Sequence, residues 1–166
     1  SLGVSKLRLT GGEPLLDKKL PDLVAGLAAL EGVEDLALTT NGMLLAPVAQ
    51  TLVEAGLQRV TISLDSLDPD VFRSMSGGRG DLATVMSAID AAAAAGLAPI
   101  KINVVVERAV NDHTVLDLLD HFRGTGHIVR LIEYMDVGNR NGWRMDQVVP
   151  SRELLEQVQA RWPLKP

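Results

Sequence analysis

The stretch SKLRLTGGEP, residues 5–14, decides the fold more than any other part of the sequence. Its first six residues alternate as a β-strand does, which places Lys6 and Arg8 on one shared face. Two glycines then permit a tight turn, and Pro14 biases Glu13 towards extended geometry. The stretch therefore predicts a strand that ends in a glycine-rich turn.

The same alternation of short strands with helical stretches continues along the chain. We predict strands at residues 5–10, 35–40, 59–64, 100–106 and 128–133. Helices are predicted at residues 20–30, 46–55, 82–95, 111–122 and 151–162, and a further short helix begins at Asp68. Strands joined in this way should be parallel, with right-handed crossovers. Two architectures fit this order: a doubly wound sheet and part of a β/α barrel.

The composition is that of an ordinary globular α/β domain. The chain has 166 residues, of which 46% are hydrophobic and 22% charged, so it is too apolar for disorder. We expect no membrane partner, because no apolar run approaches the roughly 20 residues that span a bilayer. The net charge of −5 argues against a broad nucleic-acid surface. Since no signal peptide is recognised, we expect a cytoplasmic protein.

Cysteine is absent from the sequence. Disulfides, cysteine-ligated zinc, a thiol nucleophile and an iron–sulfur cluster held by this segment are therefore excluded. The three histidines show no metal-ligand spacing. We assign no catalytic residue and no metal ligand within the chain.

Polar residues gather where the predicted strands end, and in a parallel β/α fold this is where ligands bind. Gly11 and Gly12 would let the backbone approach a ligand closely, although a plain tight turn explains them equally well. Arg8 and Lys101 lie within strands, where an exposed edge position is the simpler explanation. On the inner face of a barrel, however, such cations in a net-acidic protein indicate an anionic ligand such as a phosphate ester.

Several strings, in this order, resemble the GTP 3′,8-cyclases, a family of radical S-adenosylmethionine enzymes of molybdenum cofactor biosynthesis. They are LRLTGGEPLL, TTNG, TISLDS with LDPDVF, KINVVV and IEYMDVGNRNGW. The resemblance runs through essentially the whole chain. It implies a parallel-stranded partial β/α barrel, incomplete at both ends. We expect residues 1–166 to form a single domain, with the N-terminal cluster strand and the C-terminal cluster domain outside the sequence.

The resemblance also implies a chemistry. In the family, a reduced 4Fe-4S cluster cleaves S-adenosylmethionine to a radical that abstracts hydrogen from the ribose of GTP, and GTP becomes a cyclised pterin precursor. Carried over by motif, the S-adenosylmethionine contacts fall on Gly11, Gly12, Glu13, Ser63 and Met135. The GTP contacts fall on Arg8, Thr39, Lys101 and Arg130.

The family's two cysteine motifs have no counterpart in this sequence. We therefore expect this polypeptide by itself to be inactive, its full-length parent to be an enzyme, and the strand edge beside residues 5–10 to be unpaired. Two alternatives stay open: another radical S-adenosylmethionine enzyme, for example one that acts on peptides, and a non-catalytic nucleotide-binding remnant. A homodimer also stays open.

Overall fold

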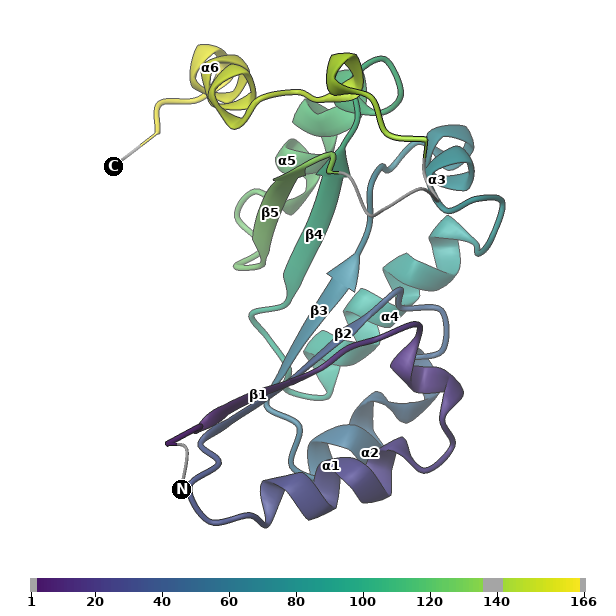
Figure 1. The fold of residues 1–166 in the computed structure, drawn as a ribbon, viewed down its shortest axis with the longest axis vertical. Helices are drawn as coiled ribbons and strands as arrows, with labels where there is room; N and C mark the ends of the chain where they lie inside the picture. The colour runs from purple at the N-terminus through teal and green to yellow at the C-terminus, as the bar shows by residue number, and fades with distance from the viewer. Residues whose placement is uncertain (1–2, 136–141, 165–166) are drawn as a thin grey trace.

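The computed structural model in Figure 1 describes residues 3–135 and 142–164. Five parallel strands form one sheet in the order β1-β2-β3-β4-β5. Their bounds are β1 (Lys6–Leu9), β2 (Asp35–Thr40), β3 (Arg59–Ser63), β4 (Lys101–Val106) and β5 (Ile128–Glu133). Each strand pairs with the next one along the chain, and the order never reverses. A doubly wound sheet contains such a reversal, so the topology is that of a partial barrel.

Helices connect the strands, as the sequence predicted. They are α1 (Leu20–Ala28), α2 (Ala49–Glu54), α3 (Pro69–Met75), α4 (Leu82–Ala94), α5 (Val115–Phe122) and α6 (Ser151–Arg161). The predicted helices at residues 46–55 and 111–122 each begin with a 3-10 turn, η2 (Ala46–Val48) and η3 (Asp112–Thr114). Asp68 caps α3 as predicted, because its carboxylate accepts from the backbone N–H groups of Asp70 and Val71. None of the described helices is long and apolar enough to cross a bilayer.

The sheet has one apolar face and one polar face. Alternate strand residues on the apolar face are fully buried against the helices in a single core: Leu36, Leu38, Val60, Ile62, Ile102 and Val104 pack with Val24 of α1, Leu52 of α2, Ile89 of α4 and Leu118 of α5. Figure 1 shows α1, α2 and α4 grouped beside β1, β2 and β3, and α5 beside β5. The helices therefore leave the other face, which carries the candidate ligand contacts, uncovered.

The register places ten polar side chains on that second face. They are Lys6, Arg8, Asp35, Thr39, Arg59, Thr61, Ser63, Lys101, Asn103 and Arg130. We call this set the polar face. It confirms the prediction that Lys6 shares a face with Arg8.

The chain after residue 142 returns to the end of β4. The Arg108 backbone N–H donates to the Gln147 carbonyl at 2.8 Å, and Glu107 forms an isolated antiparallel bridge with Val148. The Arg108 guanidinium also pairs with the carboxylate of Glu153 in α6. These contacts attach α6 and the segment before it to the residues that follow β4.

Candidate functional site

The turns that follow β1 and β2 are joined by one side chain. The Glu13 carboxylate accepts a hydrogen bond from the Thr40 hydroxyl at 2.7 Å and from the Asn41 backbone N–H at 2.7 Å. It also caps η1 (Pro14–Leu16) by accepting from the Leu15 N–H at 3.1 Å. Both carboxylate oxygens are thus engaged by protein donors. Direct contact of Glu13 with a cofactor stays a prediction, whereas its role in joining the two turns is observed.

Gly11 and Gly12 form an open turn at this rim. Gly11 has a φ of +149°, which side chains rarely adopt, and a Cβ atom at either glycine would meet no other atom within 4 Å. The space beside this backbone is therefore free to admit a ligand. Gly42, in the neighbouring turn, differs because its Cβ would come within 3.2 Å of Ile62 Cγ2.

Four of the five cations on the polar face have no ion-pair partner among the described residues. In the described part of the chain, Arg8, Lys101 and Arg130 form no ion pair. Arg59, by contrast, lies on the same face and pairs with Asp35, whose pKa is lowered chiefly by that hydrogen bond. The face therefore offers positive charge to an anionic ligand at Arg8, Lys101 and Arg130, and also at Lys6, but not at Arg59.

Arg8 is held in place by two hydroxyl groups. Its Nη1 atom donates to Thr39 Oγ1 and to Thr61 Oγ1, each at 3.0 Å. Thr61 is buried and lies between Thr39 and Lys101 in the register of the sheet. The sequence had not assigned Thr61 to the site, because its contact with Arg8 spans 53 positions.

Ser63, Asn103 and Arg130 lie side by side on β3, β4 and β5. The Oδ1 atom of Asn103 is buried and has no hydrogen-bond partner within residues 3–135 and 142–164. A buried acceptor without a partner is costly, and such atoms are rare in folded proteins. An acceptor in this position fits a ligand that brings a hydroxyl or ammonium donor. Asn103 is therefore a candidate site residue to which the sequence had given no ligand role.

A cavity of about 230 Å³ lies beside Ser63 at the same end of the sheet. It is also lined by Asn41, Asp65 and Arg79. Asp65 accepts from the Val105 backbone N–H at 2.8 Å, and burial raises the pKa of its carboxyl group. This hydrogen bond connects β4 to the residues that follow β3, beside the cavity.

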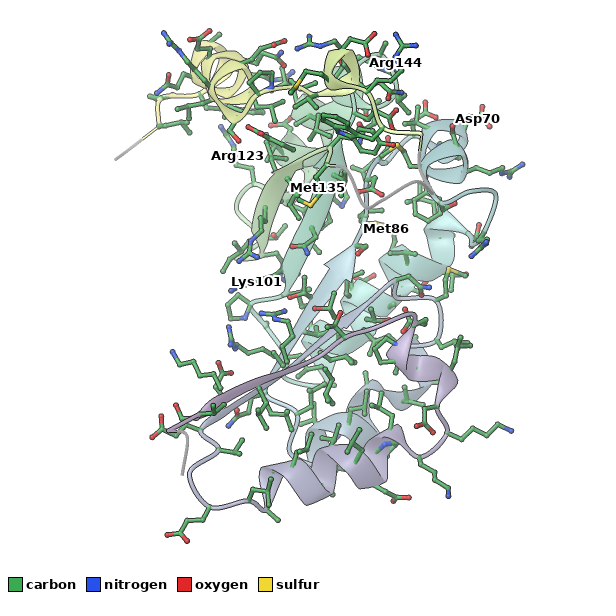
Figure 2. The ribbon with its side chains drawn as sticks, in the orientation of Figure 1. Asp70, Met86, Lys101, Arg123, Met135 and Arg144 are labelled. Atoms are coloured by element: carbon green, nitrogen blue, oxygen red, sulfur yellow. The ribbon has the colours of Figure 1, made fainter. Side chains whose placement is uncertain are left out.

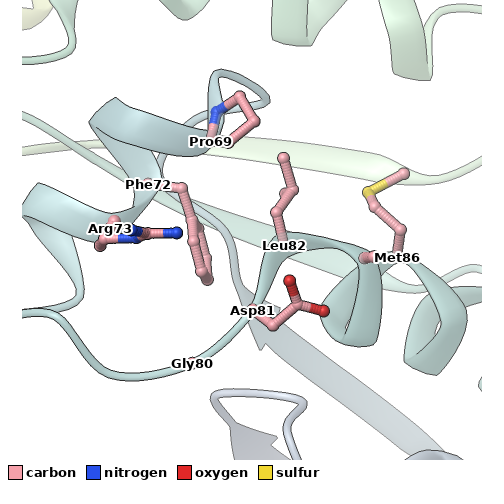
Figure 3. A pocket seen from close by; sticks show the side chains of 8 residues that line it. Pro69, Phe72, Arg73, Gly80, Asp81, Leu82 and Met86 are labelled. Atoms are coloured by element: carbon pink, nitrogen blue, oxygen red, sulfur yellow. The ribbon is translucent and has the colours of Figure 1, made fainter.

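A second cavity, of about 360 Å³, lies between α3 and α4 (Figure 3). Phe72, Leu82 and Met86 line it together with Arg73 and Asp81. None of the predicted site residues belongs to its lining.

The remaining predicted residues lie at opposite ends of the sheet. Figure 2 shows Lys101 near the start of β4 and Met135 beyond the end of β5. Met135 is 56% exposed. The Trp143 indole N–H donates to the Tyr134 carbonyl at 3.2 Å, which brings Trp143 of the GNRNGW string back to the end of β5. Residues 138–141 of that string lie outside the described residues.

The structure thus separates the predicted residues into two levels. Arg8, Thr39, Ser63, Lys101 and Arg130 share the polar face, whereas Gly11, Gly12, Glu13 and Met135 lie at the carboxyl ends of the strands. A parallel sheet whose strand order never reverses, with helices on one face only, defines a partial β/α barrel. The Radical SAM superfamily model matches residues 1–122, and the chain belongs to this superfamily.

The curated relatives that match this chain carry a more specific name than the superfamily. The chain is 59% identical over 166 residues to a GTP 3′,8-cyclase of Xanthomonas campestris pv. campestris (strain 8004), covering 100% of this chain and 49% of that protein. It is 54% identical over 164 residues to a GTP 3′,8-cyclase of Acidothermus cellulolyticus, covering 99% and 45%. The chain therefore spans about half the length of the curated relatives it matches.

Solved structures of low identity share the fold. A domain of pyruvate-formate lyase-activating enzyme from Bacteroides vulgatus matches with a TM-score of 0.71 at 20% identity, covering 93% of this chain and 90% of that one. The structure of anSMEcpe with bound AdoMet matches with a TM-score of 0.72 at 17% identity, covering 95% and 44%. These likenesses confirm the partial barrel predicted from the sequence.

Proposed function

We propose that this chain is the central segment of a GTP 3′,8-cyclase, and that it supplies contacts to S-adenosylmethionine and to GTP. The observation that carries the proposal is the set of cations on the polar face that have no ion-pair partner among the described residues. Arg8, Lys101 and Arg130 come from three different strands, and no helix covers them. Charge-assisted hydrogen bonds from such groups are the strong kind that a triphosphate accepts. The sequence similarity to GTP 3′,8-cyclases, 59% identity across the whole chain, supports GTP as the ligand of these cations.

S-adenosylmethionine would bind towards the carboxyl ends of the strands. Gly11 and Gly12 leave an accessible backbone there, and Ser63 and Met135 border the same end of the sheet. The orphaned Oδ1 of Asn103, next to Ser63, supports a ligand with hydrogen-bond donors. The ammonium group and the ribose hydroxyls of S-adenosylmethionine are such donors. When bound, this cofactor would supply the radical chemistry of the superfamily.

The residues of this chain do not fit a 4Fe-4S cluster. Cluster ligation requires thiolates, and the sequence contains no cysteine. We propose that the cluster ligands belong to parts of the full-length protein outside this sequence, and that these 166 residues alone bind ligands without turning them over. Residues 1–166 would then act as one domain, in a cytoplasmic enzyme.

The full-length protein carrying Lys101→Ala tests the proposal. We expect GTP binding to weaken by about 1.5–3 kcal/mol, the worth of one hydrogen bond to a charged group, while S-adenosylmethionine binding is nearly unchanged. Lys18→Ala is the matched control, since Lys18 is exposed and lies outside the polar face. Equilibrium dialysis with each ligand measures both affinities.

Equal weakening of both ligands, or no effect on either, would remove Lys101 from the GTP site. Binding of a peptide in place of GTP would favour the peptide-modifying alternative. Nucleotide binding without cluster formation in the anaerobically prepared full-length protein would favour a non-catalytic remnant.

A further inference from the structure

Two of the three arginines on the polar face, Arg59 and Arg8, are held in different ways. Arg59 is gripped by the Asp35 carboxylate, with Nε 2.6 Å from Oδ1, so its charge is neutralised where it stands. Arg8 is gripped by the hydroxyls of Thr39 and Thr61, each 3.0 Å from Nη1. A hydroxyl fixes the direction of a guanidinium without cancelling its charge. The Arg8 charge therefore stays available to a ligand.

The two hydrogen bonds to the threonines use only one nitrogen of the Arg8 guanidinium. Only Nη1 donates to the protein in the described part of the chain, so Nη2 and Nε keep their N–H groups for another acceptor. A guanidinium binds phosphate or carboxylate best through two parallel N–H bonds. An arginine fixed beforehand also loses less side-chain entropy when a ligand binds.

Thr61 acts through Arg8 and not on a ligand directly. Its side chain is buried at 3% exposure, whereas Arg8 is exposed and Thr39 is half-buried. It also pairs in register with Thr39, so the two hydroxyls approach Nη1 from adjacent strands. A threonine on a buried strand position needs no hydroxyl for packing, because valine has the same shape.

We propose that Thr61 is a positioning residue that aims Arg8 at an anionic group of the substrate, and that it sets the affinity for the nucleotide triphosphate while leaving the cofactor site unaffected. This inference rests on the proposed function, since it takes GTP as the ligand of Arg8. It adds a residue that neither the motifs nor the relatives' names assign.

A double-mutant cycle in the full-length protein tests the inference. The variants are Thr61→Val, Arg8→Ala and the two combined, and the measurement is the Kd for GTP and for S-adenosylmethionine. We expect Thr61→Val to weaken GTP binding by about 3- to 10-fold, the range for one lost hydrogen bond. We expect no further loss when Thr61→Val is added to Arg8→Ala, and no change in the Kd for S-adenosylmethionine.

Three further variants complete the design. Thr61→Ser keeps the hydroxyl and should restore GTP binding to within about 2-fold of the wild type. Thr51→Val, an exposed threonine of α2, is the control for loss of a hydroxyl. Thr61→Ala replaces Thr61→Val if circular dichroism shows that the valine variant is unfolded.

The outcomes separate the two proposals. If Arg8→Ala weakens GTP binding and Thr61→Val weakens it equally with and without Arg8, Thr61 does not act through Arg8 and the inference is wrong. If Thr61→Val has no effect while Arg8→Ala does, the inference is also wrong and the GTP assignment stands. If Arg8→Ala leaves GTP binding unchanged, the proposed GTP contact itself fails.

Discussion

Glu13 and Thr40 join the ends of two adjacent strands: the Thr40 hydroxyl donates to the Glu13 carboxylate at 2.7 Å, and the same hydroxyl accepts from the Gly42 N–H at 3.1 Å. Thr40 is buried and Glu13 is half-buried. The contact connects the glycine-rich turn of residues 11–14 to the turn of residues 40–43. This contact therefore holds the glycine-rich turn against the turn that follows β2.

Glu13→Gln should loosen this connection. An amide offers one acceptor oxygen and presents an NH₂ group to donors that now meet a carboxylate oxygen, such as the Asn41 N–H. We expect a loss of about 1–3 kcal/mol in the free energy of unfolding of the full-length protein, measured by urea denaturation. Glu31→Gln is the control, because Glu31 is exposed in the loop that follows α1. An unchanged stability would show that the carboxylate does not hold the two turns together.

The Arg59–Asp35 pair predicts a pH dependence of stability. Because the Asp35 pKa is lowered in the folded state, the pair stabilises the protein above the pKa of the unfolded carboxyl, near 4, and the stabilisation is lost as pH falls through the folded value. Asp35→Asn should therefore lower the free energy of unfolding at pH 7 by no more than about 1 kcal/mol, since Arg59 is partly exposed.

This difference between the wild type and Asp35→Asn should shrink as the pH is lowered from 5 towards 3. Thermal unfolding monitored at several pH values measures it. A difference that stays constant with pH would mean that lost packing, and not the ion pair, destabilises the variant.

Replacement by alanine should have opposite effects on stability at two glycines, Gly42 and Gly26. Gly42 has a φ of +81°, and its Cβ would come within 3.2 Å of Ile62 Cγ2, so Gly42→Ala should cost about 1–3 kcal/mol. Gly26 lies within α1, and its Cβ would meet nothing within 4 Å. Gly26→Ala should therefore stabilise the protein by about 0.5–1 kcal/mol. Denaturation midpoints of the two variants, compared with the wild type, would contradict this account if they moved in the same direction.

Much of the fold follows from local pattern alone. The strands predicted at residues 35–40 and 128–133 have the observed bounds of β2 and β5, and the other three differ by one residue or two at their ends. Periodicity and glycine turns define these elements locally. Local pattern could not distinguish a doubly wound sheet from a barrel, because the two differ in strand order. The resemblance to the GTP 3′,8-cyclases predicted the partial barrel, and the strand order confirms it.

The strand face on which the candidate site residues lie could be predicted from the sequence, but their contacts with one another could not. The shared face of Lys6 and Arg8 follows from strand alternation, and it is observed. The grip of Thr61 on Arg8 and the orphaned oxygen of Asn103 depend on the register between strands, which the sequence does not specify. Glu13 illustrates the limit most clearly, since its motif marks the right turn but not the protein groups that occupy its carboxylate.

Asp65 predicts a pH dependence of the opposite sign to that of Asp35. Burial raises its pKa in the folded state, so the ionised form is disfavoured there, and stability falls as pH rises from the unfolded pKa through the folded one. Asp65→Asn keeps an oxygen that can accept from the Val105 N–H and carries no charge. We therefore expect the variant to gain stability relative to the wild type as the pH rises from 4 to 8. Thermal unfolding of both proteins across this range measures the gain. If the difference in stability between the variant and the wild type is the same at every pH, the cost of burying the Asp65 charge does not determine the effect of the substitution.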